Sequence, residues 1–226
     1  ISNMTELFEA FVKVMATAID EKSPVTGGHI RRVADLTLTM AEVIHNHEEG
    51  IFKDITFSPD QMYELRIAAY MHDIGKVTSP VEIVEKAKKL QTIFDRIHYV
   101  RLRMDYMIQK VKLEGQQKKI ELLEKKADPA EIKKIESDSE EQIKELEDIR
   151  AFINKCNEPG EFLEDETLER LKEIAQRTYL DNEGQEQPFI TDDELVNLSI
   201  RRGSITEAER KKMQDHAAVT LRMLKQ

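Results

Sequence analysis

Apolar residues recur every three or four positions along most of the chain, which is the period of an amphipathic helix. This pattern predicts helices over residues 4–20, from His29 to about residue 44, and from Ser58 to an end near His72 and Asp73. No stretch shows the two-residue alternation of a half-buried strand. We therefore expect an all-α fold.

The middle of the chain predicts a long antiparallel helical hairpin that is similar to a coiled coil. Asp128-Pro129 is a helix start signal, so the first arm should end near residue 126 and the second should begin at Pro129. The Lys- and Glu-rich segment 114–142 should form a solvated tip. The seam of the first arm follows heptad spacing at Leu90, Ile93, Ile97, Val100, Met104, Met107 and Val111.

Three helices should follow the hairpin. Apolar spacing predicts the first of them within residues 162–179, and a polar loop should occupy residues 181–190. Thr191 has the sequence of a capping box for a short helix. Thr206 has the same signature and should begin the last helix, which runs to about Leu224.

Composition narrows the class of protein. The net charge of −10 argues against binding to nucleic acid polymers. The single Cys156 cannot form an intrachain disulfide, and no signal peptide or run of 18 apolar residues is present, so we expect a cytoplasmic protein that does not cross a membrane. The chain begins at Ile1 rather than Met and ends within a helical pattern. We expect it to belong to a longer protein with an upstream sensor or receiver domain.

The pair His72-Asp73 carries the first candidate chemistry. It follows the run 65–71, which is apolar except for one arginine and predicts a buried helix. Burial of an unpaired imidazole and carboxylate is costly, and a divalent metal removes that cost because both groups are good ligands. For an isolated His-Asp dipeptide, a buried histidine that pairs with its neighbour is the favoured interpretation. Gly75 allows close backbone approach, and the Lys76 ammonium could meet a phosphate.

Two further segments change this balance. Segments 23–33 (SPVTGGHIRRV) and 72–76 (HDIGK) together resemble the HD superfamily of metal-dependent phosphohydrolases, and more narrowly its HD-GYP branch. Segment 203–224 (GSITEAERKKMQDHAAVTLRML) is similar to the part of that branch that carries its next metal histidine. The resemblance covers residues 1–90 and 195–226.

The resemblance implies an HD-type helical bundle. Residues 1–90 would form the first part of its core, 91–190 a helical hairpin insertion, and 191–226 a truncated continuation of the core. It also implies a divalent metal centre with Fe or Mn. The centre should be dinuclear, because Val25 stands where some family members have the ligand of a third ion. The implied metal ligands are His29, His72, Asp73 and His216, with Asp73 bridging two ions.

The function that the resemblance implies is hydrolysis of a phosphodiester by metal-activated water, with a cyclic dinucleotide such as cyclic di-GMP as substrate. Asp73 and Lys76 would be the catalytic residues. Lys76 would bind the substrate phosphate together with Arg32, which lies one helical turn after His29.

One departure from the family pattern affects this expectation. The branch continues with a His pair, a further Asp ligand and a Gly-Tyr-Pro motif, and the chain ends at Gln226 without them. The chain as given would then hold half a site and be inactive, since four ligands cannot saturate two metals. Two alternatives remain open: a generic HD phosphohydrolase acting on mononucleotides, and a non-catalytic signalling or dimerisation module whose hairpin forms a homodimer.

Overall fold

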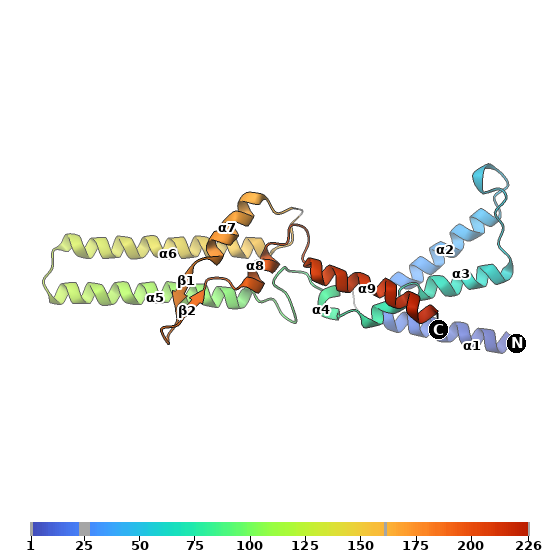
Figure 1. The fold of residues 1–226 in the computed structure, drawn as a ribbon, viewed down its shortest axis with the longest axis horizontal. Helices are drawn as coiled ribbons and strands as arrows, with labels where there is room; N and C mark the ends of the chain where they lie inside the picture. Colours follow the sequence, from blue (N-terminus) through green and yellow to red (C-terminus); the bar gives the residue numbers. More distant parts are fainter. Residues whose placement is uncertain (1, 23–27, 161, 226) are drawn as a thin grey trace. The chain divides into compact units, whose positions relative to one another are not determined.

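A computed structural model describes residues 2–22, 28–160 and 162–225 of the chain. By their contacts the residues form two compact units. The first unit comprises Ile1–Glu85 and Glu207–Gln226, and the second comprises Lys86–Thr206. Figure 1 shows the helices and strands of both units, coloured from blue at the N-terminus to red at the C-terminus.

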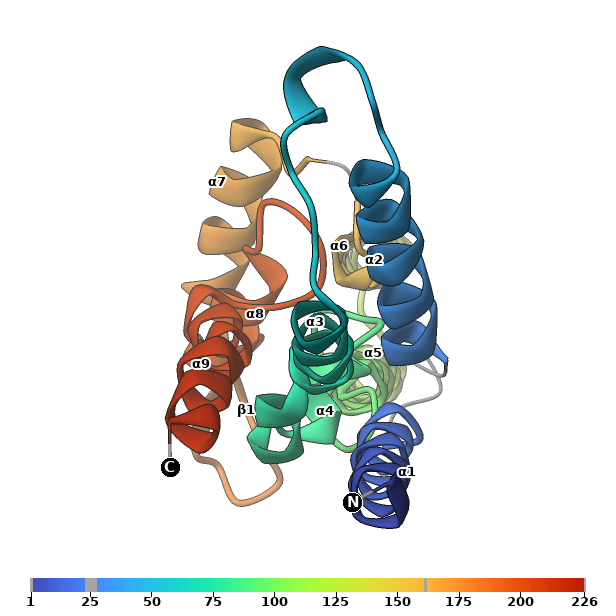
Figure 2. The same ribbon diagram turned by 90° about the vertical axis from the view of Figure 1, so that its right-hand side faces the viewer.

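The first unit is a group of helices that contains every residue expected at the metal centre. Figure 2 looks along it, with α3 between α2 and α9. Its elements are α1 (Ser2–Asp20), α2 (His29–His45), the 3-10 helix η1 (Gly50–Phe52), α3 (Pro59–Met71), the 3-10 helix η2 (Ile74–Thr78), α4 (Val81–Val84) and α9 (Glu207–Leu224).

The start of α3 follows directly from its sequence. The Ser58 hydroxyl accepts a hydrogen bond from the Gln61 N–H, the Gln61 side chain accepts one from the Ser58 N–H, and Pro59 occupies the first helical position. The helix ends at Met71, so His72 and Asp73 lie immediately after its last turn. Ala69 is the buried residue of this helix, which is less buried than its apolar run predicts.

The apolar stripes of α1 and α2 are only partly covered. Val12, Ala16 and Ile19 of α1 are buried. Leu7 and Phe11, which the period also assigns to the apolar stripe, are 66% and 60% exposed. The helical period therefore predicts the helix correctly. It also predicts more buried residues than the described structure shows. The same holds in α2, where Leu36 and Met40 are exposed.

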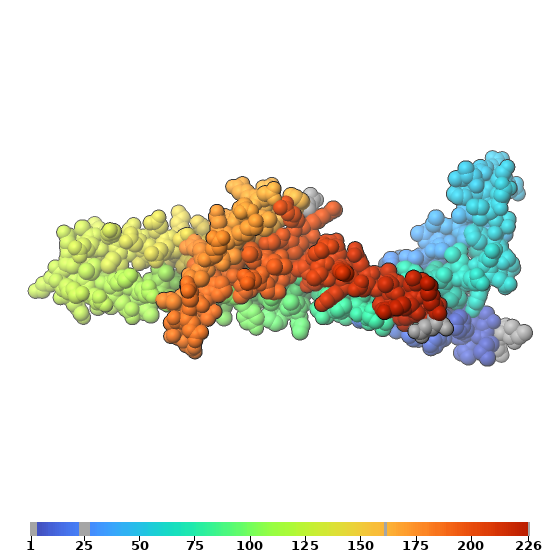
Figure 3. Space-filling view, in the orientation of Figure 1, coloured from blue at the N-terminus to red at the C-terminus, as the bar shows by residue number. Residues whose placement is uncertain are grey.

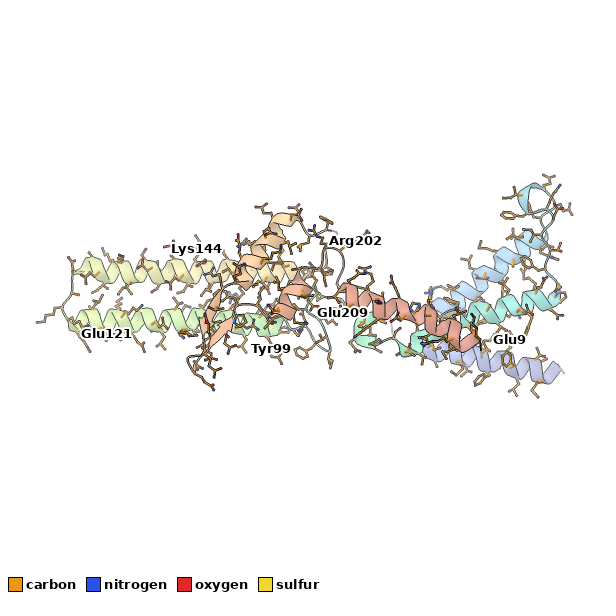
Figure 4. All side chains as sticks on the ribbon, viewed as in Figure 1. Glu9, Tyr99, Glu121, Lys144, Arg202 and Glu209 are labelled. Carbon is orange, nitrogen blue, oxygen red and sulfur yellow. The ribbon has the colours of Figure 1, made fainter. Side chains whose placement is uncertain are left out.

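The second unit contains the predicted hairpin. Helices α5 (Ile97–Glu124) and α6 (Pro129–Asn157) pack side by side along their length (Figures 1 and 3). The Asp128 side chain accepts a hydrogen bond from the Ala130 N–H and so begins the second arm as expected. Exposed charged side chains such as Glu121 and Lys144 cover the outer faces of the arms (Figure 4). The all-α class and the antiparallel hairpin are confirmed.

Two local predictions for this unit are wrong. The first arm begins at Ile97 rather than at Leu90, and Ile93 is 91% exposed in the preceding loop. A small antiparallel sheet also follows α7, which spans Asp165–Ala175. Its strands are β1 (Thr178–Leu180) and β2 (Glu186–Pro188), in a stretch where we expected the end of a helix and a polar loop.

The remaining helix of this unit, α8 (Asp192–Leu198), begins with the capping box predicted at Thr191. The expected domain boundaries at 90/91 and 190/191 stay a prediction, and the contact units divide at 85/86 and 206/207. Within the described residues, no helix combines the length and apolar character that a membrane span requires.

Candidate metal centre

Three distant segments of the chain meet at the carboxylate of Asp73. The Nε2 atoms of His72 and His29 lie 3.0 Å and 3.7 Å from its Oδ2 atom. The Nε2 atom of His216 lies 3.5 Å from its Oδ1 atom. The four residues that the sequence singles out as metal ligands thus come together within the first unit, from the start of α2, the end of α3 and the middle of α9.

Backbone carbonyls fix the orientation of two of the imidazoles. Nδ1 of His72 lies 2.7 Å from the Ala69 carbonyl oxygen, and Nδ1 of His216 bonds to the Met213 carbonyl. A carbonyl can only accept, so each Nδ1 donates to its carbonyl, and the Nε2 atom of each ring faces Asp73. A divalent cation between the rings and the carboxylate would bind all of these atoms.

The spacing of the donor atoms fits such a cation. Two ligands with bonds of about 2.1 Å lie roughly 3.0 Å apart at a right angle and roughly 3.4 Å apart at the tetrahedral angle. The three N–O separations of 3.0, 3.7 and 3.5 Å fall near these values. Ligand atoms of His29, His72 and Asp73 all lie within 4.8 Å of one another. The set of His29, His72 and Asp73 therefore fits a divalent metal in type and in spacing, and His216, which faces Oδ1 of Asp73, lies outside this group.

Lys76 also lies at this carboxylate. Its Nζ atom is 2.7 Å from Oδ2 of Asp73. The α-helix ends at Met71 and the chain continues as the 3-10 helix η2. Lys76 therefore contacts Asp73, which lies three residues earlier in the chain. Burial alone raises the pKa of Asp73, but the hydrogen bond from Lys76 and the nearby positive charges outweigh it and hold the pKa below its usual range. Asp73 therefore offers an ionised carboxylate to a metal.

Close contact between η2 and α9 brings His216 to the site. A Cβ atom placed on Gly75 would lie 2.0 Å from the His216 carbonyl oxygen and 2.7 Å from the Thr220 backbone nitrogen. The Gly75 N–H donates a 2.9 Å hydrogen bond to the buried Thr220 hydroxyl. Any larger residue would push the two backbones apart, so glycine at this position allows His216 to reach Asp73.

Two residues that position the site escaped the sequence interpretation. The buried Asp20 carboxylate accepts a 3.0 Å hydrogen bond from the Ile30 N–H, in the first turn of the helix that carries His29. Nζ of Lys22 bonds to the carbonyls of Val77 and Ser79 at 2.7 Å and 2.8 Å, at the end of η2. The sequence offers one signal for these residues: two charged side chains, Asp20 and Lys22, stand between an apolar helical stripe and a loop that contains glycine.

The remaining candidates lie at the edge of the site or beyond it. Arg32 is exposed, and its guanidinium folds back toward Gly28, where an added Cβ would lie 2.9 Å from Nη1. Val25 and the rest of segment 23–27 lie outside the described residues, so the prediction for a third metal position is not tested there.

Comparison with protein families agrees with this geometry. A family model described as HD domain matches residues 26–177. The match includes His29, His72 and Asp73 and ends before His216. No curated protein and no solved structure is similar enough to this chain to count as a match.

Proposed function

The chain belongs to the HD domain family of metal-dependent phosphohydrolases, and from this we propose that it is a phosphodiesterase of the HD-GYP type. The proposed substrate is a cyclic dinucleotide, with cyclic di-GMP first. The family membership supports hydrolysis of a phosphate ester in general. The finer assignment rests on the residues around Asp73.

The observation that carries the proposal is the set of imidazoles around one buried carboxylate. His29 and His72 face Oδ2 of Asp73, and His216 faces Oδ1. A carboxylate whose two oxygens face different histidines can bridge two ions. We therefore propose His29, His72, Asp73 and His216 as ligands of a dinuclear centre, with Fe or Mn as the metals.

The chain's own residues would bind and orient the phosphate ester. When bound, the divalent ions would lower the pKa of a water molecule and neutralise charge on the phosphate. Lys76 lies beside Asp73, and its ammonium would donate a charge-assisted hydrogen bond to a non-bridging phosphate oxygen. The exposed guanidinium of Arg32, near the start of α2, would be a second contact to the substrate.

His216 supports the HD-GYP branch over a generic HD enzyme. A minimal HD phosphohydrolase needs only the first histidine, the His-Asp pair and a further aspartate. Here an additional helix, α9, brings a third imidazole within 3.5 Å of Asp73. The upstream sensor or receiver domain and a homodimer through the hairpin stay predictions.

The test is hydrolysis by the native full-length protein loaded with Mn²⁺ or Fe²⁺. We expect turnover of cyclic di-GMP, and no turnover by the Asp73→Asn variant. Turnover of nucleoside monophosphates in place of cyclic dinucleotides would assign the protein to the generic HD enzymes. A protein that is inert toward both substrates and binds no metal would favour the signalling module.

A further inference from the structure

A second candidate site lies in the second unit and does not depend on the metal centre. It is a cavity of about 440 Å³ between the segment before α5, the end of α6 and α7. This volume is within the range of pockets that bind small molecules. Lys89 and Cys156 line it and are only 2% and 4% exposed.

Lys89 is an unusual residue at such a depth. Its ammonium group has three donors, and the Leu198 carbonyl accepts one of them at 3.1 Å. No carboxylate of the described residues forms a salt bridge with it. Burial lowers the pKa of Lys89, which reflects the cost of a charge that lacks an opposite charge. An anion that enters the cavity would supply that charge.

Two more cations act on the same position. Lys89, Arg170 and Lys155 all lower the pKa of Cys156, against the larger effect of burial, so their charges converge on the thiol that lines the cavity. The Arg170 guanidinium lies over the Phe152 ring, with its carbon 4.2 Å from the ring centroid. The planar guanidinium of an arginine can donate paired hydrogen bonds to a phosphate.

The acidic residues that line the cavity do not cancel this charge. Glu158 forms a salt bridge with Lys88, which does not line the cavity. Arg201, the fourth cation of the lining, pairs with Asp165 at 2.6 Å. Glu164 is exposed at the rim. Lys89, Lys155 and Arg170 therefore form a local excess of positive charge in a chain whose net charge is −10.

We infer that this cavity binds a phosphorylated small molecule of about nucleotide size, with its phosphate held by Lys89, Lys155 and Arg170. A single inorganic phosphate would leave most of the volume empty. The Phe152 side chain, which also lines the cavity, offers the rest of the ligand an apolar contact.

Binding of AMP to the full chain tests this inference, with adenosine and inorganic phosphate as partial ligands. Calorimetry should show that AMP binds and that each partial ligand binds at least about tenfold more weakly. Because Cys156 is the only cysteine of the chain, AMP should also slow its alkylation. Binding of AMP at a Kd above about 10 mM would overturn the inference. Inorganic phosphate that binds as tightly as AMP would overturn the assignment of ligand size.

Variants place the binding in this cavity. Lys89→Met should weaken AMP binding about tenfold or more, because it removes the buried positive charge and keeps a side chain of similar length. Lys86→Met is the matched control, since Lys86 is also buried but does not line the cavity. Arg170→Gln, at an exposed position, gives the same test without altering the interior. Loss of AMP binding in Asp73→Asn would assign the binding to the metal centre and overturn the inference.

Discussion

Asp73 is the residue on which the metal centre depends. It is buried, its two oxygens face three imidazoles, and Lys76 holds it ionised. An ionised carboxylate in such a place is stable only while positive charge surrounds it. Lys76 supplies part of that charge, and a bound divalent metal would supply more.

Replacement of His72 or Asp73 by alanine should abolish metal loading and turnover, because each change removes a ligand atom at the centre of the set. We expect the metal affinity to fall by about 100-fold or more. Loss of a residue that only hydrogen-bonds to a metal ligand already lowers metal affinity by about 10–100-fold. Calorimetric titration with Mn²⁺ measures it. His98→Ala, at an exposed histidine of the second unit, is the control. Unchanged metal affinity in Asp73→Ala would show that the ligands lie elsewhere.

Lys76→Ala should separate substrate binding from metal binding. Its ammonium bonds to Oδ2 of Asp73, the atom that a metal would use. Lys76 is therefore not itself a metal ligand, and its removal should not weaken the metal affinity. Turnover should fall by about tenfold or more through the loss of a charge-assisted contact to phosphate. Metal content and turnover are measured on the same sample. Loss of metal in this variant would mean that Lys76 stabilises the ligand set instead.

At this scale the sequence singled out the residues that meet at Asp73 but not those that position them. His72-Asp73 and His29 stand next to apolar runs and glycines, which made them candidates. Asp20 and Lys22 act through backbone groups far along the chain, at Ile30 and at residues 77–79. Such contacts depend on the tertiary fold and leave no periodic signal.

At the scale of elements, the contact between η2 and α9 decides whether His216 takes part. Gly75→Ala should separate the two backbones, since the added Cβ would meet backbone atoms that cannot rotate away. We expect a loss of stability of roughly 1–3 kcal/mol or more from this overpacking, and weaker metal binding as in His216→Ala.

Thermal unfolding and Mn²⁺ titration check this expectation. Gly160→Ala is the matched control, because a Cβ at Gly160 meets nothing within 4 Å. A Gly75→Ala variant with native stability and native metal affinity would contradict the role assigned to this contact.

The salt bridge between Arg103 and Glu194 should make the stability of the second unit depend on pH. The two side chains are 17% and 6% exposed and bond at 2.9 Å. Burial raises the pKa of Glu194, but the hydrogen bonds from Arg103 and Thr191 outweigh it and the net pKa is lowered. The contribution is therefore complete above the unfolded pKa of about 4.3 and is lost as pH falls through the folded pKa.

Urea unfolding of the wild type and Glu194→Gln measures this contribution. At pH 7 the variant should be less stable by about 3 kcal/mol, because it leaves a buried guanidinium unpaired. The difference should shrink as pH falls below the folded pKa. Glu145→Gln is the control, since the exposed pair of Glu145 with Arg177 contributes little. A difference that is constant with pH would contradict the assignment.

Long elements were predicted well and short ones were not. The heptad spacing from Ile97 onward and the cap at Asp128 fixed the hairpin because they repeat over many turns. The three-residue strands β1 and β2 are too short to show a period. Their turn depends on Asp181, which accepts hydrogen bonds from the N–H groups of Glu183 and Gln185, and on Gly184 at a φ of 77°.

On the scale of the whole molecule, the two units carry separate chemistry. All four proposed metal ligands belong to the first unit, and the cavity around Lys89 belongs to the second. The last helix of the chain returns to the first unit after the hairpin, so the site is complete only when both ends of the sequence have folded together. The long sequence separation of His216 from His72 explains why period and composition alone could not place it.

Paramagnetic broadening of the imidazole NMR signals by Mn²⁺ tests the metal centre most directly. The chain has six histidines, and three of them, His45, His47 and His98, are exposed and form no described ion pair with Asp73. On titration with Mn²⁺, the signals of His29, His72 and His216 should broaden together and first, even if binding is weak. Equal broadening of all six signals, or broadening of the exposed three alone, would contradict a metal site at Asp73.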